Sequence, residues 1–258
     1  MTYFYIHLVR IVCKGSFPLN YKKSHSIVIL AVCDVTYEFI LVDIGESGRN
    51  SDGGVLANSN LGIAMNDGLL KFPEPRTLPG TSKTFPYVLV ADEAFPLKPF
   101  MVKSYAKNIL DERKRVCNYR ISRARWRTLM ENSFGICASR FRIFRRPIIR
   151  KVDTVVAMIK AVVSLHNYLM RHESNYCPAG YADADTPFGT RSGEWREEFQ
   201  NSTGMVPIGH QGSNNFTRSA NEVREAFSPT LIPVQDVHWQ WDMVNRTADS
   251  NESDRDSD

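Results

Sequence analysis

Five carboxylates stand where a metal ion could be bound: Asp34, Asp43, Asp52, Asp92 and Glu131. Asp92 follows an apolar run typical of a buried strand, whereas Glu131 falls in a long helix-compatible stretch. Metal-assisted phosphodiester chemistry requires hard oxygen ligands from separate elements around one or two Mg²⁺ ions. Strand-end aspartates together with one helical glutamate could therefore form such a site.

Each of these residues also has an ordinary structural interpretation. A single aspartate at a strand end, such as Asp92, is more often a turn or capping residue. A single glutamate on a helix surface is more often an ion-pair partner, here of Arg125 or Arg127. Asp34 ends a strand of its own, and its alternative interpretation is a purely structural role. The carboxylates alone do not decide the function.

The segment around the glutamate is strongly basic. From Lys103 to Lys151 the chain has fifteen basic and three acidic residues, a net charge of +12, against +4 for the whole chain. Aromatic residues lie between the basic ones, among them Tyr105, Tyr119 and Trp126. This combination exceeds what solubility requires and is typical of a surface that binds a phosphate backbone. A merely solvated basic helix face is the alternative.

Other residue types give weaker signals. The five cysteines are odd in number and form no CxxC pair, which argues against a disulfide framework and against a zinc site. His166 lies beside Leu165 in an apolar stretch, where a packed histidine is expected rather than a ligand. The glycine-rich stretch 45–54 has no Walker lysine. The longest apolar run, Ile27–Cys33, is far shorter than the roughly 20 residues of a membrane-spanning helix, so we expect no membrane partner.

The elements that would position these residues follow an α/β order. Patterns of apolar residues predict strands at 7–13, 27–33, 38–44 and 87–91, and helices at 55–61, 122–144 and 153–171. The run at 27–33 is continuously apolar, as in a strand buried on both faces. Strands early and helices late predict a mixed sheet flanked by helices.

The two long helices each show an apolar stripe. In the first, the stripe consists of Met130, Phe134, Cys137, Phe141 and Phe144, and Glu131 lies about 100° around from Met130, at the edge of the stripe. In the second, Asp153 is expected to cap the N-terminus, and the stripe consists of Val155, Met158, Val162, Leu165 and Leu169.

The C-terminal third differs in composition. Gly, Ser, Asn, Pro and Asp dominate from 175 to 217, which predicts a mostly disordered segment. A short helix is expected at 221–227, Trp239 and Trp241 could pack back on the body, and 247–258 reads as a solvated acidic tail. We therefore expect a folded domain over 1–173 and a mostly disordered tail over 174–258, with a short docked segment near 219–244.

Several blocks resemble the PIF/Harbinger transposase-derived nuclease family, whose domain is a DDE endonuclease of the RNase H-like fold. The matching blocks keep their order and spacing across roughly residues 7–173. They read NYKKSHSIVILAVCDVTYEF, VDIGESGRNSDGGVLANS, YVLVADEAFPLKPFMVKSY, CNYRISRARWRTLMENSFGICASRFRIFRRPI and AMIKAVVSLHNYLMRHE. SANEVREAF and HWQWDMV also look like the family's closing segment.

The resemblance implies roles for individual residues. Asp92 matches the family's second catalytic aspartate, and Glu131 matches its catalytic glutamate. The family's first aspartate lies on the opening strand, just ahead of a Val-Arg-Ile stretch. That stretch is present here as 9–11, and counting back places Tyr5 at the aspartate's position. Asp34 is then the best remaining third carboxylate.

The resemblance further implies Mg²⁺ or Mn²⁺ held by Asp92, Glu131 and Asp34, DNA as the partner, a separate DNA-binding protein as a second partner, and a nuclear location. Two functions are compatible with these expectations. One is a divalent-metal-dependent DNA endonuclease or transposase-like domain. The other is a catalytically inactive domesticated or truncated remnant that binds DNA or a protein partner. The missing first aspartate favours the second, unless the chain is an N-terminally incomplete copy.

Overall fold

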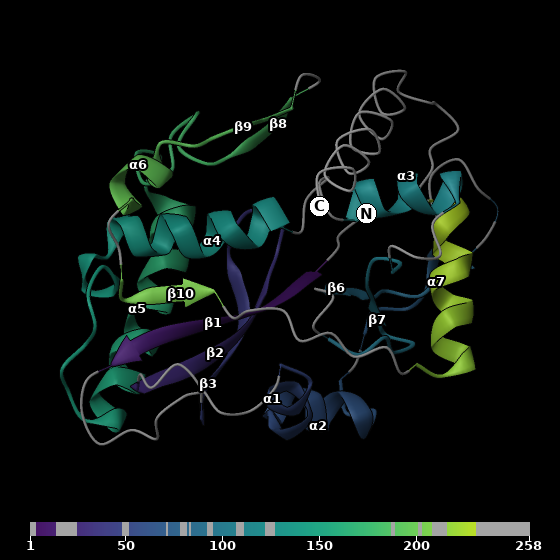
Figure 1. The fold of residues 1–258 in the computed structure, drawn as a ribbon, viewed down its shortest axis with the longest axis horizontal. Helices are drawn as coiled ribbons and strands as arrows, with labels where there is room; N and C mark the ends of the chain where they lie inside the picture. Colours follow the sequence, from purple (N-terminus) through teal and green to yellow (C-terminus); the bar gives the residue numbers. More distant parts are fainter. Residues whose placement is uncertain are drawn as a thin grey trace, which may run out of the picture.

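A central sheet lies between two helical layers in the computed structural model (Figure 1). The mixed α/β arrangement that the sequence predicts is confirmed. The structure describes residues 4–13, 25–47, 52–70, 72–77, 82, 84–91, 95–106, 111–121, 127–186, 189–200, 203–207 and 216–230.

The main sheet has the strand order β3-β2-β1-β6-β7. β1 pairs antiparallel with β2, and β2 with β3, whereas β6 and β7 run parallel to β1. A short strand, β10, pairs antiparallel with the C-terminal half of β1. The bounds are β1 Phe4–Cys13, β2 His25–Cys33, β3 Phe39–Ser47, β6 Leu89–Ala91, β7 Met101–Val102 and β10 Met205–Pro207.

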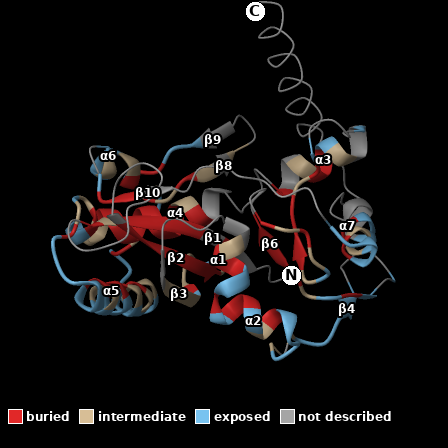
Figure 2. Cartoon of the chain, turned by 60° about the horizontal axis from the view of Figure 1, so that its bottom comes forward, coloured by how far each residue is buried: buried red, intermediate tan, exposed pale blue. Residues whose placement is uncertain are grey.

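β2 is the most deeply buried strand. Every residue from Ser26 to Cys33 is buried, as the continuous apolar run predicts. Both faces of the sheet are therefore covered by other elements, and Figure 2 shows the buried positions gathered in these strands. A strand with two covered faces must carry side chains that avoid water on each side, which explains the β-branched run.

Different helices cover the two faces. One face packs against α4 (Arg127–Arg140) and α5 (Val152–His172), and the opposite face packs against α1 (Asp52–Asn58) and α2 (Asn60–Asn66). The first core contains Val9, Ile11, Ile29, Ala31, Val90, Met130, Phe134 and Val155. The second contains Ile6, Leu8, Leu30, Leu89, Val55 and Met65.

α4 corresponds to the helix predicted over 122–144, but it begins later and ends earlier than predicted. It spans Arg127–Arg140 and is followed by a 3₁₀ turn, η3, at Arg142–Phe144; residues 122–126 lie outside the described residues. Four residues of the predicted stripe are buried and Phe141 is partly buried. Glu131 is half-buried at the edge of this stripe, as predicted, with 34% of its side chain exposed.

α5 differs from the prediction in two details. Its N-cap is Lys151, without a side-chain hydrogen bond, and Asp153 lies within the first turn, so the predicted cap at Asp153 is wrong. A carboxylate in the first turn still favours the helix because it faces the positive end of the helix dipole. The buried stripe is Val155, Ile159, Val162 and His166, whereas Leu165 is 49% exposed.

His166 takes the core position because its two ring nitrogens find partners there. Nε2 lies 3.0 Å from the Tyr37 carbonyl oxygen, and Nδ1 lies 2.8 Å from the Tyr176 hydroxyl. A carbonyl oxygen only accepts, so Nε2 carries the proton and Nδ1 accepts from Tyr176. The predicted packed histidine is confirmed. Burial lowers the pKa of His166 to about 4, and the hydrogen bond to Tyr37 opposes this shift.

α5 also meets a simple test for a membrane span. It is the one helix in the described part of the chain that is long and apolar enough, by length and composition, to cross a membrane. The packed helix of a soluble protein passes the same test. Here Val155, Ile159 and Val162 lie in the core shared with the sheet. The expectation of no membrane partner stays a prediction.

The segment expected to be mostly disordered, 175–217, forms ordered elements over much of its length. β8 (Ala184–Thr186) and β9 (Gly189–Arg191) form a hairpin, and α6 (Trp195–Phe199) follows. Tyr176, Tyr181 and Trp195 are buried against Ile136 of α4. Composition predicted disorder because these few aromatic anchors are diluted among polar residues. β10 then joins the central sheet, beyond residue 173, where we expected the folded domain to end.

At the far end of the sheet, α7 (Arg218–Thr230) contacts both β7 and α3 (Glu112–Ile121), and the two helices meet at a steep angle (Figure 1). α7 contains the helix predicted at 221–227, and its Arg224 guanidinium lies 4.2 Å from the centre of the Tyr105 ring. A small separate sheet pairs β4 (Arg76–Thr77) with β5 (Thr84–Phe85). Trp239, Trp241 and 247–258 lie outside the described residues.

His166 makes stability depend on pH. The folded protein keeps the imidazole neutral, whereas the unfolded chain takes up a proton near pH 6.5. We therefore expect the free energy of unfolding to be highest above pH 6.5 and to fall by about 3 kcal/mol as the pH drops toward 4. Urea titrations at pH 7, 6 and 5 measure this loss. His166→Gln should flatten it, and His172→Gln, at an exposed site, should not; equal slopes in all three proteins would contradict the prediction.

Candidate active site around Glu131

The backbone at Tyr5 lies where three strands meet. Tyr5 pairs with Cys33 of β2 on one side and with Val90 of β6 on the other, and Ile6 pairs with Ala91, the last residue of β6. The side chain of Tyr5 and the whole of Asp92 lie outside the described part of the structure. In the sequence, Asp92 follows Ala91 directly. The position that the resemblance assigns to the first aspartate is thus adjacent to the strand that leads to the second.

α4 crosses the sheet at this place. Burial raises the pKa of the Cys33 thiol, and a hydrogen bond with Ser133 of α4 opposes the rise. The rings of Phe134 and Phe39 meet edge to face, with centroids 5.1 Å apart. Because Cys33 pairs with Tyr5, the first turns of α4 lie over the part of the sheet where β1 and β6 run side by side. Glu131 is two residues before Ser133.

Glu131 has an ion-pair partner from a distant part of the chain. Nη2 of Arg196, 65 residues later, donates to Oε2 of Glu131 at 2.7 Å. The predicted partners, Arg125 and Arg127, have side chains outside the described set. Arg196 and Glu131 remain 40% and 34% exposed. The ion-pair interpretation of Glu131 is therefore met, with a partner that the sequence did not suggest.

Asp183 fixes Arg196 in turn. Its side chain is only 1% exposed. Nε of Arg196 donates to both carboxylate oxygens of Asp183, at 2.9 and 3.0 Å, and Nη2 donates to Oδ2. Oδ1 also accepts from the backbone N–H of Gly193 at 2.7 Å. The pKa of Arg196 is raised, first by its hydrogen bond with Asp183 and also by Glu131, against the opposing effect of burial.

Two neighbours of Glu131 dock this partner segment on α4. The Asn132 side chain accepts from the Asp183 N–H and from Trp195 Nε1, both at 2.8 Å, and donates to the Asp183 carbonyl at 3.0 Å. The Trp195 ring lies against Gly135, where an added Cβ would come within 2.4 Å of it. Only glycine leaves room for this approach.

Asp34 is used by the turn between β2 and β3. Its Oδ1 accepts from the backbone N–H groups of Thr36 and Glu38, at 2.9 and 3.1 Å, and from the Thr36 hydroxyl at 2.7 Å. The same turn holds Tyr37 at φ +67°, a backbone conformation that residues other than glycine rarely adopt. These contacts give Asp34 a structural role. Its Oδ1 is committed to the turn, so any metal contact would have to use Oδ2.

The two other carboxylates have local positions. Oδ2 of Asp43 accepts from the backbone N–H of Asn60, the first residue of α2, at 2.8 Å, while Ser59 caps that helix. Asp52 is the first residue of α1, and its side chain is outside the described set. Among the described residues, no three His, Cys, Asp or Glu side chains gather closely enough to hold a metal ion. The half-exposed carboxylate of Glu131 has the chemistry of an Mg²⁺ or Mn²⁺ ligand, whereas Asp34 fits that role poorly.

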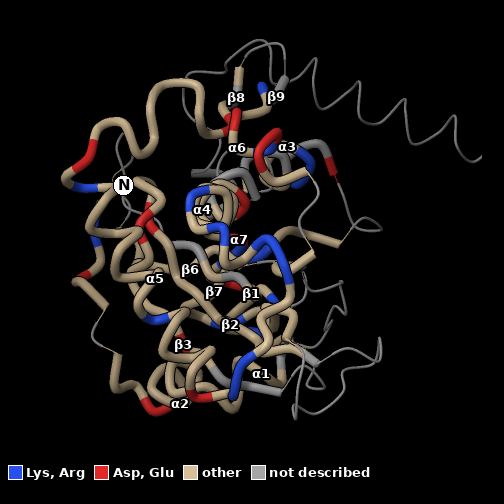
Figure 3. The backbone as a smooth tube through the Cα atoms, turned by 90° about the vertical axis from the view of Figure 1, so that its left-hand side faces the viewer, with Lys and Arg blue, Asp and Glu red and all other residues tan. Residues whose placement is uncertain are grey.

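The arginines near α4 divide into two groups. Arg140 donates to the Tyr176 carbonyl, and Arg145 donates to the Ser139 carbonyl and to Glu198, so these two serve the fold. The segment after α4 carries exposed basic residues instead, and Figure 3 shows Lys and Arg, in blue, on α4 and on the chain beside it. The exposed ones are Arg142, Arg146, Arg150 and Lys151.

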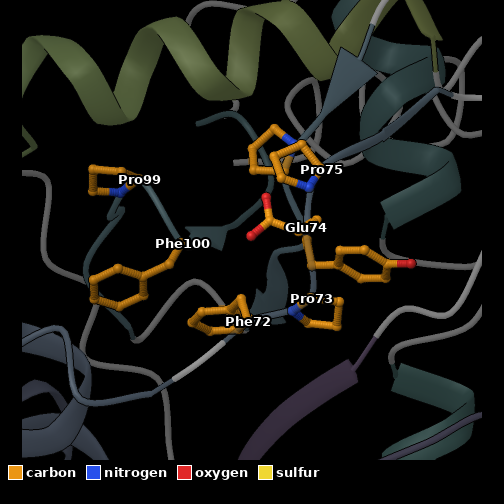
Figure 4. A pocket seen from close by; sticks show the side chains of 8 residues that line it. Phe72, Pro73, Glu74, Pro75, Pro99 and Phe100 are labelled. Carbon is orange, nitrogen blue, oxygen red and sulfur yellow. The ribbon is translucent and has the colours of Figure 1, made fainter.

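A hollow of about 320 Å³ lies away from these groups. Phe72, Tyr87 and Phe100 line it together with four prolines, and Glu74 is its one carboxylate (Figure 4). Of the three candidate carboxylates whose side chains the structure describes, Asp34, Asp43 and Glu131, none lines this hollow. The candidate site is therefore the surface where α4 crosses the sheet.

A family model described as DDE superfamily endonuclease matches residues 13–167. The chain belongs to this family. The match contains Asp34, Asp92 and Glu131 and begins after Tyr5. Neither the curated proteins nor the solved structures give a match. Among the described residues, the family match thus covers β2, β3, the helices of both layers and Glu131, but not Asp183 or Arg196.

Sequence reasoning missed Asp183, Trp195 and Arg196. The signal for them was weak: a single tryptophan beside an arginine and two glutamates, within a stretch otherwise rich in Gly, Ser and Asp. A large aromatic residue in such a stretch is a docking point, since leaving it in water forgoes a large favourable burial.

The hydrogen bonds of Asp34 in the turn allow its structural role to be tested separately from a role as a metal ligand. Asparagine offers the same acceptor oxygen without the charge, so we expect Asp34→Asn to retain the stability of the wild type and Asp34→Ala to lose about 1–2 kcal/mol. Thermal and urea unfolding measure this difference. If Asp34 is structural only, Asp34→Asn also retains the Mn²⁺ affinity of the wild type in calorimetry. A large loss of Mn²⁺ affinity in Asp34→Asn would instead make Asp34 a ligand.

Proposed function

We propose that the chain is an RNase H-like domain of PIF/Harbinger transposase descent that acts on the phosphodiester backbone of DNA with a divalent cation. Its membership of the DDE superfamily endonucleases supports nuclease ancestry and DNA as the substrate. The strand order supports the fold assignment: a three-stranded antiparallel part, β3-β2-β1, continues into the parallel strands β6 and β7.

The observation that carries this proposal is the convergence of three elements. β1 and β6 run side by side and parallel, β6 ends at Ala91, and α4, which carries Glu131, contacts β1 and β2 and meets Cys33, the partner of Tyr5, through Ser133. In this proposal Glu131 and Asp92 hold the cation, and Asp34 is a third candidate through Oδ2. A divalent cation so bound supplies positive charge for the attacking and leaving oxygens of a phosphodiester. In the sequence Asp92 directly follows β6, and Glu131 lies in α4, so the two carboxylates come from separate parts of the chain.

The exposed arginines support the DNA part of the proposal independently. Arg142, Arg146 and Arg150 have exposed side chains on the segment that follows α4. Guanidinium groups bind phosphate oxygens by charge-assisted hydrogen bonds and release counterions on binding. We infer a phosphate-backbone contact along this segment. We further propose, from the family resemblance alone, that the protein works in the nucleus with a separate DNA-binding protein as partner.

A second function is favoured by one observation. Tyr5 has the strand register, between Cys33 and Val90, at which the resemblance expects an aspartate. A neutral phenol does not replace a carboxylate as a ligand for a hard cation. In this alternative the chain is a catalytically inactive remnant that still binds DNA or a protein partner. The two functions differ in cleavage and agree in DNA binding.

Cleavage separates the two functions. With supercoiled plasmid and Mn²⁺, we expect nicking by the wild type that Asp92→Ala and Glu131→Ala each abolish, because each variant loses a carboxylate ligand. Tyr5→Asp should raise the nicking rate, by at least about tenfold, since it restores a carboxylate between β2 and β6.

The control is Glu197→Gln, an exposed single-charge change on α6. Equal nicking by the wild type, Asp92→Ala and Glu131→Ala would refute the nuclease proposal. No nicking by the wild type combined with nicking by Tyr5→Asp would support the inactive remnant and identify the lost residue.

Salt dependence tests the phosphate contact. Each lost phosphate contact should reduce the slope of log K against log salt by about 0.9, so Arg142→Gln, Arg146→Gln and Arg150→Gln together should reduce it by up to about 3. Fluorescence anisotropy with a duplex of random sequence, from 50 to 300 mM NaCl, measures this slope. Arg218→Gln on α7, whose partner is Glu222, is the matched control. An unchanged slope in the triple variant would place the DNA contact elsewhere.

A further inference from the structure

Arg196 is held by Asp183 far more firmly than by Glu131. The buried Asp183 carboxylate accepts from both Nε and Nη2 of Arg196, whereas Glu131 accepts only from Nη2. Asp183 is itself anchored by the Gly193 N–H and, through its backbone, by Asn132. The guanidinium therefore has a fixed position that does not depend on Glu131. Glu131 is the member of this group whose orientation the others determine.

The charges of the group leave Glu131 attractive to a cation. Asp183 and Glu131 carry two negative charges and Arg196 one positive charge, so these three described side chains together have a net charge of −1. A lone arginine at 2.7 Å would cancel the charge of Glu131. Asp183 offsets that arginine because a bidentate carboxylate pairs with it on the buried side. Glu131 and Arg196 are both partly exposed, so a cation could reach this side of the group.

We propose that Arg196 is a positioning residue for Glu131. The hydrogen bond from Nη2 fixes Oε2, and with it the plane of the carboxylate, in the orientation in which Glu131 binds the divalent cation. Metal-ligating carboxylates are commonly held by such a second hydrogen-bonding partner, and loss of that partner typically reduces metal affinity or activity 10–100-fold. This inference rests on the proposed function, and it extends the site to Arg196 and Asp183, both of which lie beyond the family match.

The contacts also explain why the site needs the segment beyond residue 173. Asn132, adjacent to Glu131, is buried and binds both the Asp183 backbone and the Trp195 indole. The Arg196 guanidinium lies 4.4 Å from the centre of the Trp195 ring. Asp183, Trp195 and Arg196 are thus docked on the first turns of α4, and Glu131 is oriented from outside its own helix.

Mn²⁺ binding by the full chain tests this inference, with calorimetry and the electron paramagnetic resonance of free Mn²⁺ as readouts. We expect about 10–100-fold weaker binding by Arg196→Gln. Arg196→Lys should recover part of the affinity, since its ammonium keeps the charge and can still donate to Glu131. Asp183→Asn should also bind more weakly, because it loosens Arg196. Glu197→Gln, next to Arg196 on α6, is the matched control and should bind Mn²⁺ as the wild type does.

A double-mutant cycle distinguishes positioning from loss of structure. Arg196→Gln should add no further loss of Mn²⁺ affinity to Glu131→Gln, since it acts through that residue. Thermal unfolding of each variant identifies any that do not fold, and Arg196→Lys then carries the test. Unchanged or tighter Mn²⁺ binding by Arg196→Gln would overturn the inference alone, because Arg196 would then be neutral or a competitor of the cation. A wild type that binds no Mn²⁺ would overturn the proposed metal dependence and this inference with it.

Discussion

The ion pair between the buried Asp183 carboxylate and Arg196 is the interaction on which the surroundings of Glu131 depend. A charge that is 1% exposed must be paired, because burying it without a partner would cost several kcal/mol. Asp183 finds that partner in Arg196 and a further donor in the Gly193 N–H. This requirement holds β8 and α6 at a fixed distance from each other. It also brings a guanidinium to the one acidic side chain described in α4.

This arrangement explains the residue type at each described position from Met130 to Gly135. Met130 and Phe134 face the sheet, and Ser133 meets Cys33. Asn132 binds Asp183 and Trp195, and Gly135 gives space to the Trp195 ring. Glu131 is the member of the block that turns to neither core, and its carboxylate is half-exposed. A helix packed on two sides leaves only its edge for chemistry, and Glu131 occupies that edge.

Much of the fold could be predicted because it rests on local patterns. The run Ile27–Cys33 predicted a strand buried on both faces, and the stripe from Met130 to Phe144 predicted the face of α4. Burial patterns of this kind repeat every two or every three to four residues, so sequence reveals them. In α5 the apolar pattern predicted Leu165 at a core position that His166 occupies instead. This polar residue can be buried because both of its ring nitrogens have hydrogen-bond partners. Hydrogen-bonded polar core residues have no periodic signature.

The site was predictable only in part, for the same physical reason. Glu131 stood out as one acid in a basic stretch, but its partner Arg196 lies 65 residues away, and no local rule connects the two. The disorder expected at 175–217 followed from average composition, whereas the order there comes from Trp195, Tyr181 and Tyr176 packing on α4. A few large contacts decide whether such a segment folds, and composition averages them away.

The length of α4 sets the distance between Glu131 and the exposed arginines, the two ends of the proposed substrate surface. Glu131 is near its N-terminus, and the exposed arginines begin just after its C-terminus, at Arg142. The nine helical steps from Glu131 to Arg140 span about 14 Å. The phosphates of one DNA strand advance about 3.4 Å along the helix axis per base pair, so this span corresponds to about four base pairs. If a duplex lies along α4, the basic segment would hold the backbone about four base pairs from the phosphate beside Glu131. In the proposed function, the exposed arginines after α4 and the single acid of α4 would then have separate tasks: these arginines would bind the strand, and the half-exposed carboxylate would hold the cation beside the bond.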